Sequence, residues 1–132
     1  MAKYEHEGAA IDFKLDSDAR TALDTDTLEA GDIVIRDNLI GVVKNKIGED
    51  ELGALHLAGV YELSDAEIVA TASDVDQGDA VELNVSADNI HVWGDAPDDV
   101  YFGTAIADGT SDDVVYARLE QRSASLLEEL AT

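Results

Sequence analysis

The chain has 132 residues, of which 45% are hydrophobic, and it contains no Cys. This length indicates one domain with a real core, and the missing Cys excludes disulfides, thiol chemistry and Cys-based zinc sites. No run approaches the ~18 apolar residues that span a bilayer, and the N-terminus lacks a signal-peptide core, so we expect a soluble, unprocessed protein without a membrane partner.

The charge balance is strongly acidic. Thirty acidic residues against eight basic ones give a net charge of −22. Such a surface repels phosphates and anionic lipid headgroups, which argues against a nucleic-acid partner. The acids are spread between apolar segments, unlike those of a disordered acidic tail. Because the Debye length is only ~3 Å in ~1 M salt, the composition indicates a folded protein adapted to molar salt.

The first third of the chain predicts an arm, a strand, a loop and a hairpin. Residues 1–10 form a polar N-terminal arm that carries Tyr4, and a β-domain is expected over residues 11–119. Ile11, Phe13 and Leu15 alternate with polar residues, as in a half-buried strand. Asp16–Thr27 shows no clear period and is predicted to be a loop. The turn Ala30–Asp32 opens a strand over residues 33–35, and Asp37-Asn38 joins it to a hairpin partner over residues 39–43.

Leu52–Leu63 is the longest apolar stretch with few charges. This stretch follows the polar connection Lys44–Glu51. From Leu55 onward, its odd-numbered and its even-numbered residues are both largely apolar. This pattern is typical of a central strand that is covered on both faces. Gly59 in its middle indicates a bulge or a close approach of another backbone.

The later part of the chain predicts further short strands. Ser64–Glu67 matches a capping box, and either one helical turn or a short strand fits the residues after it. Strands are expected over residues 81–85, 90–93, 100–106 and 114–119, with Val100, Phe102, Thr104 and Ile106 on one face of the third. The segment Gly31–Val34 resembles Gly78–Val81, although the match is too weak to indicate a duplication.

The tail predicts a short amphipathic helix over residues 120–132. Its apolar positions are Leu126, Leu127 and Leu130, which continue the helical spacing from Leu119. Many short strands with Gly-Asp turns and one terminal helix predict a mainly β protein. We expect an antiparallel β-sandwich or a small β-barrel with a short C-terminal helix.

Motifs for catalysis or cofactor binding are missing from the sequence. There is no Gly-x-Ser-x-Gly and no P-loop, and the three His residues lie far apart. Asp74–Val85 superficially resembles an EF-hand loop but has Asp79 at the glycine position and Val85 in place of the bidentate Glu. Close carboxylate pairs such as Asp98-Asp99 arise from composition alone. We therefore predict no enzyme activity, no cofactor and no specific metal site.

Four segments in a fixed order carry a resemblance to a known family. They are Leu28–Ile35, Asn38–Val43, Gly48–Leu55 and Leu57–Leu63. Together with residues 77–81, 102–106 and 115–119, they resemble the small capsid cement, or decoration, proteins of tailed viruses. Many members of that family carry the label of a predicted RecA/RadA-family phage recombinase. The missing P-loop, the small size and the acidic charge contradict that label here.

The resemblance implies a β-rich structural protein on the outer capsid surface of the virion. It further implies a homotrimer that binds the major capsid protein, and the acidic composition suggests a virus of a haloarchaeal host. The alternative is a free-standing acidic β-rich binding module of a halophile with no virion role. Candidate interface residues, with the shell or between protomers, are Tyr4, Leu126, Leu127 and Leu130, although the leucines could equally cover the protomer's own sheet.

Overall fold

Two β-sheets, antiparallel except for one parallel strand pair, form the body of the protein in the computed structural model, which describes residues 10–36, 39–94, 100–110 and 112–121. This confirms the predicted β-sandwich, and the strands of the described part close no barrel. The first sheet contains β1 (Ala10–Lys14), β2 (Ile33–Arg36), β3 (Leu39–Val43), β4 (Leu52–His56) and β7 (Ile90–Val92). The second contains β5 (Val60–Ser64), β6 (Ala80–Leu83), β8 (Val100–Ala105) and β9 (Val114–Leu119).

The predicted central strand over Leu52–Leu63 is wrong, because the stretch forms two strands in different sheets. β4 pairs with β1 and β3, whereas β5 pairs with β9. The chain crosses between the sheets at Leu57–Gly59, where Gly59 has φ +120°, a conformation that favours glycine. The stretch looked apolar on both faces because it combines two strands that lie in different sheets and have different surroundings.

The predicted loop Asp16–Thr27 is also wrong, because it contains helix α1 (Ser17–Leu23). Asp16 caps this helix, its Oδ1 accepting a hydrogen bond from the backbone N–H of Ala19 at 3.0 Å. Only Ala19 and Leu23 of the helix are buried. Two inward residues four positions apart give too short a period to be recognised in the sequence.

The remaining strands lie where the sequence predicts them, with two adjustments. The capping-box segment forms the 3₁₀ helix η1 (Asp65–Glu67), and Glu67 Oε1 accepts from the Ser64 N–H at 2.8 Å; a second 3₁₀ helix, η2, spans Ala72–Asp74. In β8 the expected face is wrong beyond Phe102, because the pairing with β6 is irregular there. Ala105 is consequently buried, and Ile106 is exposed.

The two sheets repeat one four-strand topology. The order β1-β4-β3-β2 in the first sheet corresponds to β5-β9-β8-β6 in the second. β7, which follows β6 in the chain, is the addition, and it pairs in parallel with β2 at the edge of the first sheet. The register repeats as well, because Val34 pairs with Gly41 as Val81 pairs with Gly103.

The turns that open β2 and β6 repeat in atomic detail. The carboxylates of Asp32 and Asp79 each accept from the backbone N–H three residues earlier, at 3.0 and 2.9 Å. The preceding glycines, Gly31 and Gly78, have φ of +92° and +93°. The faint resemblance between these two segments of the sequence thus marks a structural repeat.

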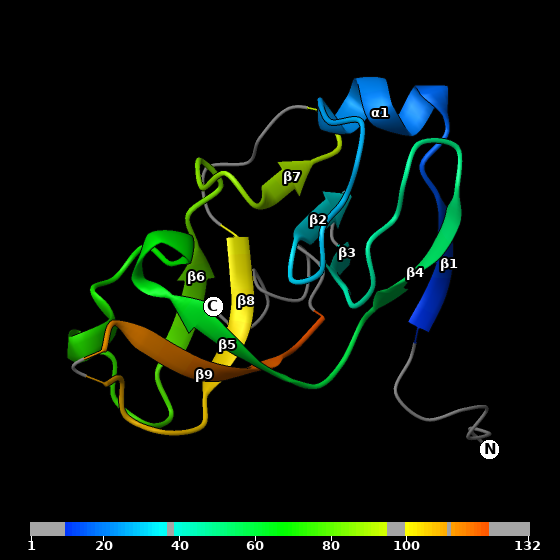
Figure 1. Ribbon diagram of the computed structural model, residues 1–132. Coiled ribbons are helices and arrows are strands. Elements are labelled where there is room, and N and C mark those ends of the chain that lie inside the picture. The colour runs from blue at the N-terminus through cyan, green and yellow to red at the C-terminus, as the bar shows by residue number, and fades with distance from the viewer. Residues whose placement is uncertain (1–9, 37–38, 95–99, 111, 122–132) are drawn as a thin grey trace, which may run out of the picture.

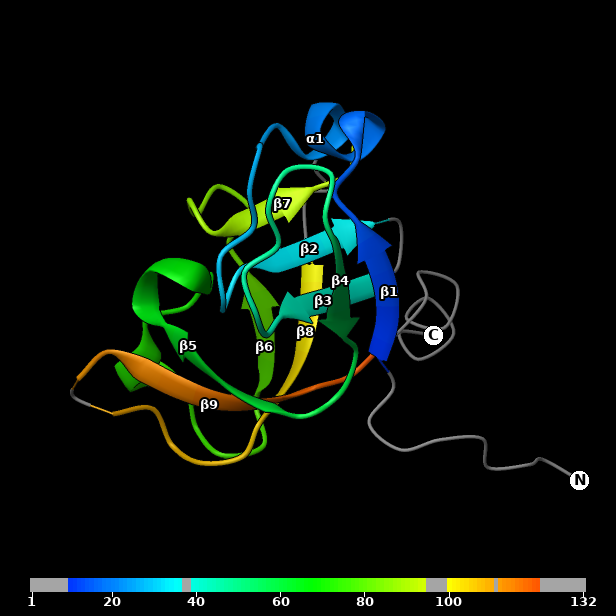
Figure 2. The ribbon, with the colours of Figure 1, turned by 45° about the vertical axis from the view of Figure 1, so that its right-hand side comes forward.

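The packing has three layers, with the first sheet in the middle. Figure 1 shows α1 at one end of the molecule and β5 with β9 toward the other, and Figure 2 shows the same separation after rotation. One core lies between α1 and the first sheet, and a larger one lies between the two sheets. The first contains Phe13, Leu15, Ala19, Leu23, Leu28, Val34, Val43, Ile47 and Leu55, and the second includes Ile33, Ile35, Ile40, Val42, Leu63, Leu83, Phe102, Val115 and Leu119.

Candidate docking surface

The second sheet has an outward face that no other layer covers in the described part of the chain. In β5 and β9 the side chains alternate, so that Leu63, Val115 and Ala117 point into the core. Val60, Glu62, Tyr116 and Arg118 point to solvent. We call this surface the outward face; it also includes Tyr101, Thr104 and Ile106 from β8 and its end, and Ala80 and Glu82 from β6.

Three large apolar side chains lie together on the outward face. Val60, Tyr116 and Ile106 are 48%, 41% and 37% exposed, and they make up half of the exposed large hydrophobic residues in the described segments. The register places Val60 opposite Arg118, while the Ile106 N–H donates to the Tyr116 carbonyl at 2.9 Å. Cross-strand and diagonal neighbours are within side-chain reach, so the three form one patch around Arg118.

Arg118 belongs to no ion pair within the described residues. Arg20, by contrast, binds Asp50 at 2.7 Å and Glu49 at 3.5 Å, and Lys46 lies 3.7 Å from Glu29. In a chain with so many carboxylates, an exposed guanidinium without one is available to a carboxylate of another molecule.

Hydrogen bonds fix the polar part of the outward face. The Thr104 hydroxyl donates to Glu120 at 2.6 Å, and the Tyr101 hydroxyl lies 3.1 Å from Thr104 and 3.3 Å from Glu120. On the buried side of the same sheet, the Tyr61 hydroxyl donates to the Ala58 carbonyl at 2.7 Å, and burial raises the pKa of Tyr61. The polar side chains of the outward face are therefore held by bonds to one another.

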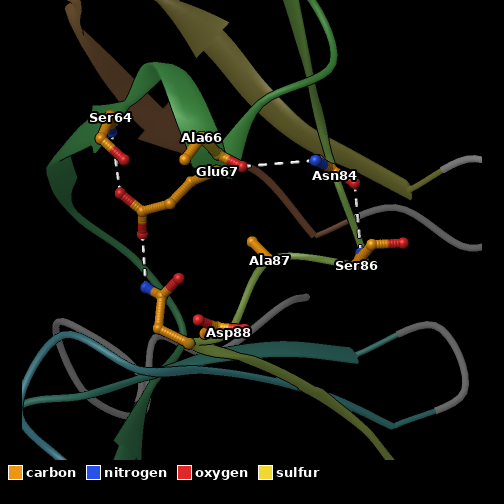
Figure 3. A pocket seen from close by; sticks show the side chains of 8 residues that line it. Ser64, Ala66, Glu67, Asn84, Ser86, Ala87 and Asp88 are labelled. Carbon is orange, nitrogen blue, oxygen red and sulfur yellow. Dashed lines mark hydrogen bonds between the residues drawn. The ribbon is translucent and has the colours of Figure 1, made fainter.

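A surface hollow of about 570 Å³ lies between η1 and the loop that leads to β7 (Figure 3). The Glu67 carboxylate spans it, accepting from the Ser64 N–H at 2.8 Å and from Asn89 Nδ2 at 2.5 Å. On the other side of the hollow, Asn84 Nδ2 donates to the Ala66 carbonyl at 3.4 Å. These groups are used in holding the loops together, so the hollow has a structural role.

The described residues were also compared with the requirements of a metal site. No group of three or more potential metal ligands occurs among them. His91 Nε2 lies 3.1 Å from Asp32 Oδ2, a pair that joins β7 to the turn before β2. A search of the same residues for a helix able to cross a membrane finds none.

Comparison with protein families shows to which family the chain belongs. Residues 16–119 match the family model of the phage cement protein. The chain belongs to this family. A phage cement protein is a structural, capsid-stabilising component of the virion, so its working parts are surfaces that bind other proteins. No curated protein and no solved structure is significantly similar to the chain.

The interface residues that the sequence suggested for this cement protein lie outside the described residues. Tyr4 belongs to residues 1–9, and Leu126, Leu127 and Leu130 belong to residues 122–132, so their role remains a prediction. The sequence analysis missed the outward face, because Val60 was assigned to a strand buried on both sides. The alternation of Tyr116 and Arg118 with Val115 and Ala117 was the signal that could have indicated it.

Proposed function

We propose that this cement protein decorates the outer surface of a tailed-virus head in molar salt and binds the major capsid protein there. The distribution of charge supports this proposal. Among the residues that the structure describes, Asp32 is the only buried charged one, so nearly all described carboxylates face solvent. Their mutual repulsion is almost fully screened only at ~1 M salt. The proposed host is accordingly a haloarchaeon.

The acidic surface favours the outside of the shell over the inside. Packaged DNA presents a dense array of phosphates, which repel a chain of net charge −22. On the outer surface the protein is separated from the DNA by the shell.

We further propose a homotrimer in which the tail contributes to the protomer contacts. Leu126, Leu127 and Leu130 share one face of the helix predicted for the tail, and Tyr4 lies on an arm that could add a strand to an edge of the shell protein. In the described part of the chain, β1 and β7 are the edge strands of the first sheet, and β5 and β6 are those of the second. Backbone pairing of this kind does not depend on charge.

Labelling of intact, DNA-filled heads in ~1 M salt tests the outer location. Lys44 and Lys46 are exposed, so an amine reagent that cannot enter the head should modify them in intact particles as fully as in disrupted ones. Modification only after disruption would place the protein inside. The free-standing binding module of a halophile predicts that purified heads contain no copies of this chain.

A further inference from the structure

The outward face of the second sheet has the composition of a protein-binding surface. We propose that it is the face that docks on the shell, with Tyr116 as the apolar anchor and Arg118 as the contact to a carboxylate of an acidic shell protein. The inference rests on the proposed function and names the surface that performs it. The partner is a protein surface that is apolar at its centre and carries at least one carboxylate.

The opposite end of the molecule is unsuited to an acidic partner. Around α1, the exposed side chains include Asp16, Asp18 and Asp24. The cation there, Arg20, already binds Asp50 and Glu49. These aspartates repel an acidic shell, and Arg36, a second cation near this end, lies over the Trp93 ring at 4.1 Å from its centroid.

The outward face combines an unpaired cation with an aromatic side chain. Arg118 has no ion pair within the described residues, and Tyr116, Val60 and Ile106 surround it. Tyr and Arg are enriched among the residues that dominate binding energy at interfaces. β9, which carries both, is hydrogen-bonded to β5 on one side and β8 on the other, so its side chains are held in place before binding.

The structural repeat allows the outward face to be compared with the face of the first sheet that packs against the second sheet. The shared register places Val60 where the first sheet has Ala10, and Tyr116 where it has Ala54. The positions that pack against the second sheet, such as Ile33 and Ile35, correspond instead to the exposed Ala80 and Glu82. Compared with the equivalent positions of the first sheet, the outward face therefore has smaller or more polar side chains on β6 and larger side chains on β5 and β9. No layer of the described chain covers these larger side chains.

A reconstitution assay tests this assignment. Heads that lack the protein are mixed with Tyr116→Ala, Arg118→Ala or Arg118→Glu at ~1 M salt, and occupancy is measured against free protein. Matched controls are Leu52→Ala and Lys14→Ala, an exposed apolar residue and an exposed cation that lie opposite each other on the first sheet. Thermal unfolding and light scattering verify that each variant keeps its fold and its oligomeric state.

We expect the two alanine variants of the outward face to bind about tenfold more weakly, Arg118→Glu to bind more weakly still, and both controls to stay within about twofold of the natural chain. Equal binding by the natural chain and all outward-face variants would overturn the assignment. So would variants that lose self-association, because the face would then be a protomer contact. If the natural chain itself fails to bind heads, the proposed function is wrong, and the inference fails with it.

Discussion

Single side chains join the two sheets at their boundary, and Gln121 is the clearest case. Its Nε2 donates to the carbonyls of Ile40 and Leu57 at 2.6 and 2.9 Å, and its Oε1 accepts from the Ile40 N–H at 2.9 Å. β3 pairs with β4 only through Val42 and Val43, so the side chain satisfies the backbone of Ile40 where no strand does. The end of β9 is thereby tied to the first sheet.

Replacement of Gln121 by Ala should lower the free energy of unfolding by about 1–3 kcal/mol, since it leaves the backbone groups of Ile40 without their partner. Chemical denaturation at ~1 M salt measures the change. Gln77→Ala is the control, because among the described contacts Gln77 bonds through its backbone N–H only. A stability equal to that of the control would show that water replaces the amide without loss.

The raised pKa of Tyr61 predicts that the protein loses stability at alkaline pH. Burial raises its pKa above the ordinary value of 10.0, so the folded state retains a proton that the unfolded state releases. The contribution is complete below pH ~10 and is lost as the pH rises through the raised value. Tyr61→Phe should unfold with a weaker dependence on pH above 10 than the natural chain does, and parallel pH profiles would contradict this.

At the scale of elements, much of the architecture could be predicted from the sequence. Strict alternation and Gly-Asp turns located most strands, because each strand buries one face. The passage of the chain from one sheet to the other after His56 could not be predicted. Residues 57–59 contain no charge and no proline, so the sequence reads as one continuous strand there. α1 was missed because this short helix buries only Ala19 and Leu23, which is too few residues to show a helical period. The candidate site was missed because it depends on which face remains open, and only the packing of the layers determines that.

The Asp16 cap predicts the stability of α1. Asp16→Ala should lower the free energy of unfolding by about 1 kcal/mol, because the N–H of Ala19 loses its acceptor. Asp16→Asn should restore most of it, since the amide oxygen can still accept. If the two variants were equally unstable, the charge of Asp16 would matter more than the hydrogen bond.

The tail can be tested separately from the hydrogen bonds of Gln121 to the first sheet. Removal of residues 122–132 keeps Glu120 and Gln121 and should leave a folded protein, which light scattering at ~1 M salt should find to be monomeric if the predicted helix joins protomers. Unfolding of this truncated chain would instead show that Leu126, Leu127 and Leu130 cover the protomer's own sheet. An intact trimer would exclude both roles.

For the whole molecule, the negative charge opposes attachment to the shell. The shell of a halophilic virus is expected to be acidic too, so long-range attraction cannot hold the protein, and burial of apolar surface must do so. High salt screens the repulsion, and kosmotropic salts strengthen the burial. The same charge predicts no saturable binding to single- or double-stranded DNA at ~1 M salt, which a titration monitored by fluorescence anisotropy would check.

Removal of Met1–Gly8 tests the arm at the scale of the particle. The free protein should keep its unfolding transition, because the arm is polar and carries Tyr4 as its one aromatic residue. Its occupancy on heads should fall if the arm adds a strand to the shell. Normal decoration by the shortened chain would show that attachment does not need the arm.

The most direct measurement follows decorated heads while the salt is lowered stepwise from molar concentration. The amount of this protein that sediments with the heads is compared at each step with the integrity of the shell in electron micrographs. The account predicts that the protein leaves the particle, or unfolds, well below ~1 M salt and before the shell comes apart. Heads that keep every copy in low salt until the shell itself dissociates would contradict it.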